Sequence, residues 1–174
     1  WYIPLFILVI TSASNAVNLT DGLDGLAGGL LILAFTVFGA IAFAKGLLIL
    51  TIFCAILIGS LLAYSWNNVP PALYYMGDTG ALAYGATLGV IAMMTNSLVV
   101  LLVVGAVFIV ETLSVIIQLL SKKFLGRKVF LIAPLHHHFE KLGWGEAKIT
   151  MRFWIIGAIA GGLGLIIGLV GMGK

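Results

Sequence analysis

Charged side chains and cysteines are scarce in this 174-residue sequence. Only 9% of the residues are charged, whereas 62% are apolar and the mean hydropathy is +1.22. In soluble domains roughly a quarter of all residues are charged, so this composition excludes an ordinary soluble domain. The single cysteine, Cys54, excludes a disulfide framework and a cysteine metal site. A net charge of +3 calls for no nucleic-acid partner, and the ten-residue alternation of a membrane β-barrel does not occur.

Long apolar runs dominate what is present. A helix of about 20 residues spans a ~30 Å hydrocarbon core, and several runs reach that length. The sequence therefore predicts an all-α, polytopic integral membrane protein with a single domain over residues 1–174. Six membrane-spanning helices are expected, at residues 2–17, 25–44, 47–66, 80–95, 97–120 and 149–172.

The distribution of charge orients these six helices. Alternating spans put the loops 18–24, 67–79 and 121–148 on one side of the membrane, with seven of the nine basic residues. Lys45 and Lys174 fall on the other side. The positive-inside rule makes the first side cytoplasmic. Five of the six acidic residues and all three histidines share it, so the candidate reactive groups gather on one face.

Four Asn and Asp side chains and several glycines lie between the first two apolar runs, at residues 15–29. Asp21 can cap the following helix, where an acid suits the positive end of the helix dipole. Capping explains one acid but not two, because Asp21 and Asp24 share a helical face and repel unless a cation or donor lies between them. Glycines let a ligand approach the backbone. Since Asn15 and Asn18 extend the polar line, we interpret this stretch as a functional site.

A second polar stretch, residues 67–80, combines two prolines, two tyrosines and one carboxylate. The prolines favour an extended or turn backbone. Asp78 can cap the fourth helix, and the tyrosines can belong to an interfacial aromatic belt. The functional interpretation is that a ring stacks on a nucleobase while Asp78 holds Mg²⁺, which prefers one or two carboxylates together with phosphate oxygens and water.

Three consecutive histidines, residues 136–138, lie in a basic loop. Zinc sites need ligand spacings such as i, i+4, and three adjacent histidines on a helix cannot converge on one ion. Histidine can instead contact a phosphate or relay a proton. Within the fifth apolar run we expect Glu111 to make a buried hydrogen bond between helices, with no catalytic role, and Gln118 to reach a ligand.

Three motifs together resemble the polyprenyl-phosphate N-acetylhexosamine-1-phosphate transferases. They are Asn-x-x-Asn-x-x-Asp-Gly-x-Asp-Gly-Leu-Ala at 15–27, Tyr-Met-Gly-Asp-Thr-Gly at 75–80 and Pro-Leu-His-His-His-Phe-Glu at 134–140. The histidine version resembles the bacterial cell-wall branch of this family. The resemblance implies Mg²⁺-dependent transfer of phospho-MurNAc-pentapeptide from UDP-MurNAc-pentapeptide to undecaprenyl phosphate. The products would be lipid I and UMP, made at the cytoplasmic face of the bacterial plasma membrane.

The resemblance also implies roles for single residues. Asp78 would hold Mg²⁺, Asp21 would lie at the reaction centre, and His137 and His138 would contact phosphate or assist catalysis. The substrate-binding residues that it implies are Asn15, Asn18, Gly22, Leu23, Asp24, Asn68, Tyr75, Gln118 and His136. In this set Asp24, with its two preceding neighbours, would read uracil, and Tyr75 would stack on it. Membrane lipids would surround the helices.

One feature of the family is missing, the adjacent Asp-Asp pair of its earlier helices. The family fold has about ten helices, of which the six predicted here would be the last six. The first residues, Trp-Tyr-Ile-Pro, also lack an initiator Met and the basic start of a signal peptide. We therefore expect a C-terminal portion with little or no turnover alone, whose partner is the missing N-terminal half. The resemblance further suggests a homodimer.

Two alternatives remain open at this point. Within the family, a related transferase that uses UDP-GlcNAc differs mainly in the histidine loop. Outside the enzymes, a membrane transport module could use Asp21, Asp24 and Glu111 as an ion path. Such a module would spread ionisable groups through the midplane of the membrane, whereas here most of them lie on one side.

Overall fold

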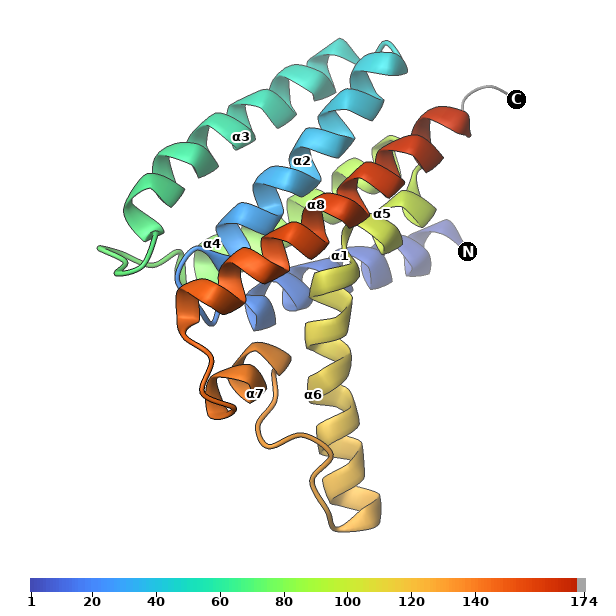
Figure 1. The fold of residues 1–174 in the computed structure, drawn as a ribbon. Helices are drawn as coiled ribbons and strands as arrows, with labels where there is room; N and C mark the ends of the chain where they lie inside the picture. Colours follow the sequence, from blue (N-terminus) through green and yellow to red (C-terminus); the bar gives the residue numbers. More distant parts are fainter. Residues whose placement is uncertain (172–174) are drawn as a thin grey trace.

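The computed structural model describes residues 1–171, and helices account for the regular structure of that part (Figure 1). The predicted all-α class is confirmed. The helices are α1 (Tyr2–Thr20), α2 (Leu26–Ala44), α3 (Leu48–Asn68), α4 (Gly77–Met94), α5 (Leu98–Val104), α6 (Ala106–Leu125), α7 (Leu135–Lys141) and α8 (Glu146–Val170). The expected end of the last span at residue 172, and Lys174, lie outside the described residues.

The helices that could cross a membrane differ in number from the six predicted. Within residues 1–171, α1, α2, α3 and α8 are long and apolar enough, and the bent pair of α5 and α6 makes a fifth if it counts as one span. The segment expected at 80–95 forms α4, which is not among them. Helix α4 begins earlier, at Gly77, and its polar first turn with Asp78 and Thr79 lowers its mean hydropathy.

The segment expected at 97–120 is not one straight helix. Helices α5 and α6 meet at Gly105 at an angle of 75°. The Gly105 N–H donates to the Leu101 carbonyl at 2.8 Å, and a Cβ on Gly105 would lie only 2.7 Å from that oxygen. Glycine therefore permits a turn that a larger residue would crowd. Beyond this turn α6 runs away from the other long helices (Figure 1).

Helix α2 forms the centre of the bundle, with α3 and α8 packed against it (Figure 1). Its side chains Phe35, Phe38 and Ile41 are fully buried. Lipid tails are as apolar as these side chains, so close packing rather than burial from water holds membrane helices together. Small residues allow that packing: a Cβ on Gly39 would lie 3.2 Å from the Cβ of Cys54 on α3.

Helices α1 and α4 form an antiparallel pair that positions the site. A Cβ on Gly85 would lie 2.6 Å from the carbonyl oxygen of Ala13, and one on Gly89 would lie 3.3 Å from the Cα of Ile10. Two small residues four apart are typical of membrane helices in close backbone contact. Because the pair is antiparallel, the first turn of α4 lies beside the last turn of α1.

We expect Gly85→Ala to destabilise the fold, because the added methyl group meets the backbone of α1. Overpacking of this kind costs about 1–3 kcal/mol. The matched control is Gly59→Ala on α3, where a Cβ would meet nothing within 4 Å. The thermal unfolding midpoint in detergent should fall for Gly85→Ala and stay level or rise slightly for Gly59→Ala. Equal midpoints for the two variants would contradict the close approach of α1 and α4.

Candidate functional site

Asp24 joins three segments that are far apart in the sequence. Its carboxylate Oδ2 accepts a hydrogen bond from the Ala72 N–H at 2.8 Å, and its own N–H donates to Glu146 Oε1 at 2.7 Å. Its carbonyl oxygen accepts from the Thr150 hydroxyl at 3.1 Å. Asp24 is buried, so these bonds fix the loop after α1, the loop after α3 and the start of α8 against one another.

Asn68 reinforces this junction from the end of α3. Its Oδ1 accepts from the Gly25 N–H at 2.9 Å, and its Nδ2 donates to the Tyr74 carbonyl at 3.0 Å. The side chain is 2% exposed. Both polar atoms of the amide thus have protein partners, and Asn68 supports the loops that flank the site from beneath.

Asp21 follows the end of α1 and Asp78 lies in the first turn of α4, close enough for the charge of Asp78 to act on Asp21. Burial, and next the negative charge of Asp78, raise the pKa of Asp21 from 3.8 to about 6. Asp78 is exposed in the first turn of α4. Two neighbouring negative charges repel, so a positive charge between them would help to hold both carboxylates ionised.

This carboxylate pair fits a hard divalent cation. Magnesium prefers one or two carboxylates and completes its octahedron with water and phosphate oxygens. Across residues 1–171, no three His, Cys, Asp or Glu side chains form a cluster that could cage a metal ion. Two carboxylates would leave most of an octahedron to water and phosphate oxygens.

The glycines of the first motif make room for protein side chains. A Cβ on Gly22 would lie 2.3 Å from Nε2 of His136, and one on Gly29 would lie 2.1 Å from the ring of Trp154. Gly25 has a left-handed backbone with φ of 74° immediately before α2. Rings from α7 and α8 therefore fill the space of a side chain at Gly22 and Gly29, while the backbone of Gly22 is exposed and its role in substrate binding stays a prediction.

The other residues of the first motif differ in exposure. Leu23 is buried in the apolar core. Asn15 is exposed and its Nδ2 donates to the Thr11 carbonyl at 2.8 Å, within α1. Asn18 is half-buried, one turn before Asp21. The polar line from Asn15 to Asp21 therefore runs along α1 from an exposed side chain toward the carboxylate pair.

The first of the three histidines lies in the interior. His136 is fully buried, and both its backbone N–H and its Nδ1 lie 3.1 Å from carboxylate oxygens of the buried Glu111. Glu111 thus makes the buried hydrogen bonds between helices that the sequence analysis expects, joining α6 to α7. The other ring nitrogen, Nε2, is buried against Gly22 and has no hydrogen-bond partner among the described residues.

The next two histidines are half-exposed and have other partners. His137 Nδ1 pairs with Glu140 one turn later on α7. His138 Nδ1 accepts from the Leu131 N–H at 3.2 Å. The three Nδ1 atoms thus have different protein partners, although the rings of His136 and His137 lie close together, with centroids 4.2 Å apart.

Gln118 is engaged with the backbone after α6. Its Oε1 accepts from the N–H groups of Val129 and Phe130 at 3.0 Å, and its Nε2 donates to the Phe130 carbonyl at 2.8 Å. The expected role of Gln118 in lining a nucleoside pocket would require breaking these bonds. The amide instead fastens the segment after α6 to that helix.

The loop before α4 presents one free aromatic ring. Tyr75 is 73% exposed, three residues before Asp78. The preceding Tyr74 is fixed, because its hydroxyl accepts from Asn67 Nδ2 at 3.1 Å and its ring packs on Tyr64. Tyr75 therefore can stack on a flat ligand beside the carboxylate pair.

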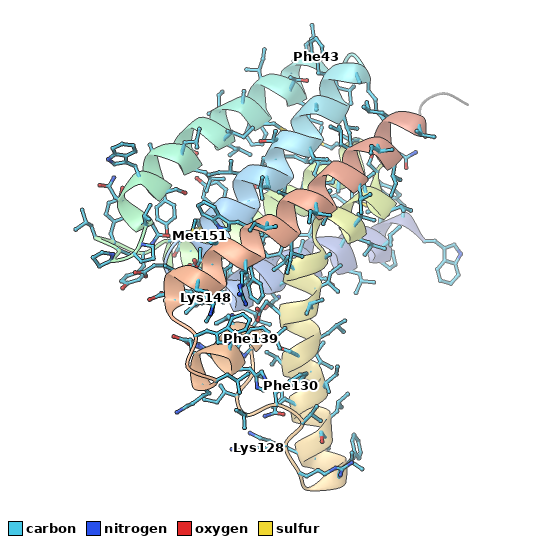
Figure 2. The ribbon with its side chains drawn as sticks, viewed as in Figure 1. Phe43, Lys128, Phe130, Phe139, Lys148 and Met151 are labelled. Carbon is cyan, nitrogen blue, oxygen red and sulfur yellow. The ribbon has the colours of Figure 1, made fainter. Side chains whose placement is uncertain are left out.

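Aromatic side chains hold α7 against α8. Figure 2 shows Phe139 between these helices, where its ring stacks on Trp144 with centroids 4.7 Å apart. The guanidinium of Arg152 lies 4.2 Å from the Trp144 ring centroid, which attracts the cation. Phe130 and Lys128 lie farther out along α6 (Figure 2). The histidine helix is thus clamped between α6 and α8.

An apolar cavity of about 440 Å³ lies between α1, α5 and α6. Its lining includes Leu8, Val17, Leu102 and Phe108. Val17 is four residues before Asp21, so about one helical turn separates the cavity wall from the carboxylate pair.

Sequence reasoning missed Glu146 and Trp154, which hold the loop after α1 in place. Glu146 accepts from the Asp24 N–H, and Trp154 Nε1 donates to the Gly25 carbonyl at 3.1 Å. A carboxylate in the first turn of a helix is ordinary capping chemistry, and a tryptophan near a membrane end is ordinary too. Neither residue carried a signal that distinguished it.

Residues 1–96, more than half of the chain, match the model of glycosyl transferase family 4. The chain therefore belongs to this enzyme family, which favours catalysis over the transport module.

Curated relatives are more specific. The chain is similar to the phospho-N-acetylmuramoyl-pentapeptide-transferases of Granulibacter bethesdensis (51% identity), Dinoroseobacter shibae (48%) and Pelagibacter ubique (43%). These matches cover 93%, 94% and 95% of this chain, but 49%, 50% and 50% of the relatives. The chain thus spans about half the length of the curated relatives it matches.

We expect Asp21→Asn to stabilise the protein at neutral and higher pH when divalent cations are chelated. A folded-state pKa of about 6 exceeds the ordinary 3.8, so the fold binds the proton more tightly and loses stability as the pH rises through this interval. The amide removes that penalty. Thermal midpoints of variant and wild type should therefore separate between about pH 4 and pH 7.

Asp78→Asn serves as the comparison for Asp21→Asn. It should recover only the smaller part of the stabilisation, because burial rather than the charge of Asp78 is the larger cause of the raised pKa. Parallel curves of midpoint against pH for wild type and Asp21→Asn would contradict the assignment.

Proposed function

We propose that this chain forms the C-terminal half of a Mg²⁺-dependent phosphotransferase of the bacterial plasma membrane. It would transfer phospho-MurNAc-pentapeptide from UDP-MurNAc-pentapeptide to undecaprenyl phosphate, giving lipid I and UMP. The observation that carries the proposal is the proximity of two carboxylates, Asp21 and Asp78, which the close α1–α4 pair brings near enough to interact through charge. The names of the relatives support the MurNAc-pentapeptide substrate over UDP-GlcNAc.

The carboxylate pair suits phosphoryl transfer. Such reactions depend on positioning and on neutralising charge that spreads over phosphate oxygens. Asp78 would hold Mg²⁺ and Asp21 would lie beside the reacting phosphate. When bound, Mg²⁺ neutralises phosphate oxygens. The protein orients the reacting groups through the buried bonds of Asp24 and Asn68, which hold the two loops around the pair.

The apolar cavity supports the lipid substrate. A polyprenyl chain needs an apolar channel, and this one ends about one turn of α1 from Asp21. A chain lying against Val17 and Phe108 would bring its terminal phosphate toward the carboxylate pair. This arrangement agrees with a lipid that enters sideways from the membrane. We assign the loops of the site to the cytoplasmic face because most of the basic residues follow them.

Asp78→Asn tests the metal assignment. In the complete polypeptide, loss of this ligand should lower turnover with Mg²⁺ at least about 100-fold. The side chain is exposed, so the thermal midpoint in detergent should change little. Thr87→Val, a half-buried position farther along α4 whose hydroxyl bonds only within that helix, is the control and should retain wild-type turnover. Near-normal turnover of Asp78→Asn would refute the metal role.

Tyr75→Ala tests the nucleotide site. Loss of one stacked base costs about 1–3 kcal/mol, so binding of UMP measured by calorimetry should weaken about 5- to 150-fold. Tyr2→Ala, an equally exposed aromatic at the other end of α1, should leave UMP affinity unchanged. An unchanged affinity for Tyr75→Ala would argue against stacking at this ring.

A further inference from the structure

Helix α6 has two different faces. One is apolar and exposed, and the other carries a buried row of polar side chains, called here the buried polar stripe. The stripe consists of Glu111, Ser114, Gln118 and Ser121. Gln118 and Ser121 bond the backbone of the segment after α6, at residues 127–130. Ser114 donates to the carbonyl of Glu111 itself at 2.6 Å. Glu111 is the charged member of this stripe, and it points to the histidine helix.

Glu111 determines where the His136 ring holds its hydrogen. The carboxylate receives the backbone N–H of His136 at 3.1 Å through Oε1 and faces Nδ1 at 3.1 Å through Oε2. The backbone N–H of His136 already donates to this carboxylate, and an ionised carboxylate only accepts, so the hydrogen between Oε2 and Nδ1 belongs on the ring. Nδ1 therefore carries a hydrogen whether the ring is neutral or charged, and both groups are fully buried.

The other ring nitrogen is left without a partner. His136 Nε2 is buried and makes no hydrogen bond with the described residues. It lies against Gly22, where an added Cβ would be 2.3 Å away. Buried polar atoms without partners are rare in folded proteins and mark a place where another group is needed. Here that place adjoins the residue after Asp21.

We infer that Glu111 is a positioning residue, which holds the hydrogen of His136 on Nδ1 and thereby presents Nε2 to a phosphate oxygen beside Gly22. Donation through Nε2–H to a bound phosphate requires the doubly protonated ring, in which Nδ1–H still donates to Glu111. The imidazolium then lies between two anions, and such hydrogen bonds to charged groups are short and strong. The effect on turnover rests on the proposed function, whereas the position of the hydrogen does not.

The test measures the ring nitrogens of His136 directly. The complete polypeptide, labelled with ¹⁵N-histidine in detergent, gives the resonances by NMR, and His136→Gln assigns them. The wild type should show a protonated Nδ1, and adding UMP should also protonate Nε2. In Glu111→Gln the amide offers one oxygen for two N–H donors, and its NH₂ favours a bare Nδ1. The Nε2–H tautomer should therefore appear.

Turnover provides the second measurement. Partners that orient a functional histidine are worth about 10- to 100-fold, so kcat should fall by that factor in Glu111→Gln, with KM for the nucleotide substrate changing less. Ser114→Ala is the matched control, because Ser114 lies on the same buried stripe but bonds only within α6. It should keep both the tautomer and kcat. Glu111→Asp keeps the charge with a shorter reach, and should give intermediate values of both.

Each outcome decides the inference. A Nδ1–H tautomer and kcat that both stay at wild-type values in Glu111→Gln, with only a lower thermal midpoint, would reduce Glu111 to a support for α7 and overturn the proposal. If Glu111→Gln does not fold, unchanged tautomer and kcat in Glu111→Asp would overturn it equally. A wild type with the expected tautomer but without transfer activity would refute the proposed function and leave the role of Glu111 intact.

Discussion

The buried hydrogen bonds of Asp24 are the constraint on which the rest of the site depends. A carboxylate taken out of water must be matched by donors, or the fold loses several kcal/mol. The Asp24 carboxylate accepts a hydrogen bond from the Ala72 N–H, and the neighbouring Asn68 side chain accepts one from the Gly25 N–H. These bonds allow one arrangement of the loops after α1 and α3. Asp21, Tyr75 and Asp78 all lie in or next to those loops, so their relative positions follow from the junction.

The lengths of the apolar runs in the sequence predict most of the helices. The predictions that fail have identifiable physical causes. The long apolar helices α1, α2, α3 and α8 lie close to their expected bounds, because twenty apolar residues have few other solutions. The bend at Gly105 was not predicted, since a lone glycine inside an apolar run resembles many in straight membrane helices. Only the crowding between its Cβ position and the Leu101 carbonyl distinguishes it, and that contact exists only in the folded backbone.

The sequence predicts those features of the candidate site that depend on the type of side chain alone. Acids in two loops on one side predict a cation site. Asp21 and Asp78 lie close enough to interact through charge, and the cation itself stays a prediction. The amides of Asn68 and Gln118 resemble ligand-binding groups in sequence, yet their partners are backbone atoms. Backbone partners leave no trace in the sequence. Gly22 is the sharpest case, because the ring that requires its missing side chain lies more than a hundred residues later.

The 75° bend links the apolar and polar parts of the site. Had α6 continued along α5, its stripe would follow the bundle instead of turning toward the histidine helix. The turn carries Glu111 to α7, and the same departure from α1 leaves the cavity lined by Val17 and Phe108. Both features meet the end of α1, one at Gly22 through His136 and the other a turn before Asp21. A single glycine thus lets one helix border an apolar cavity on one side and order a buried histidine on the other.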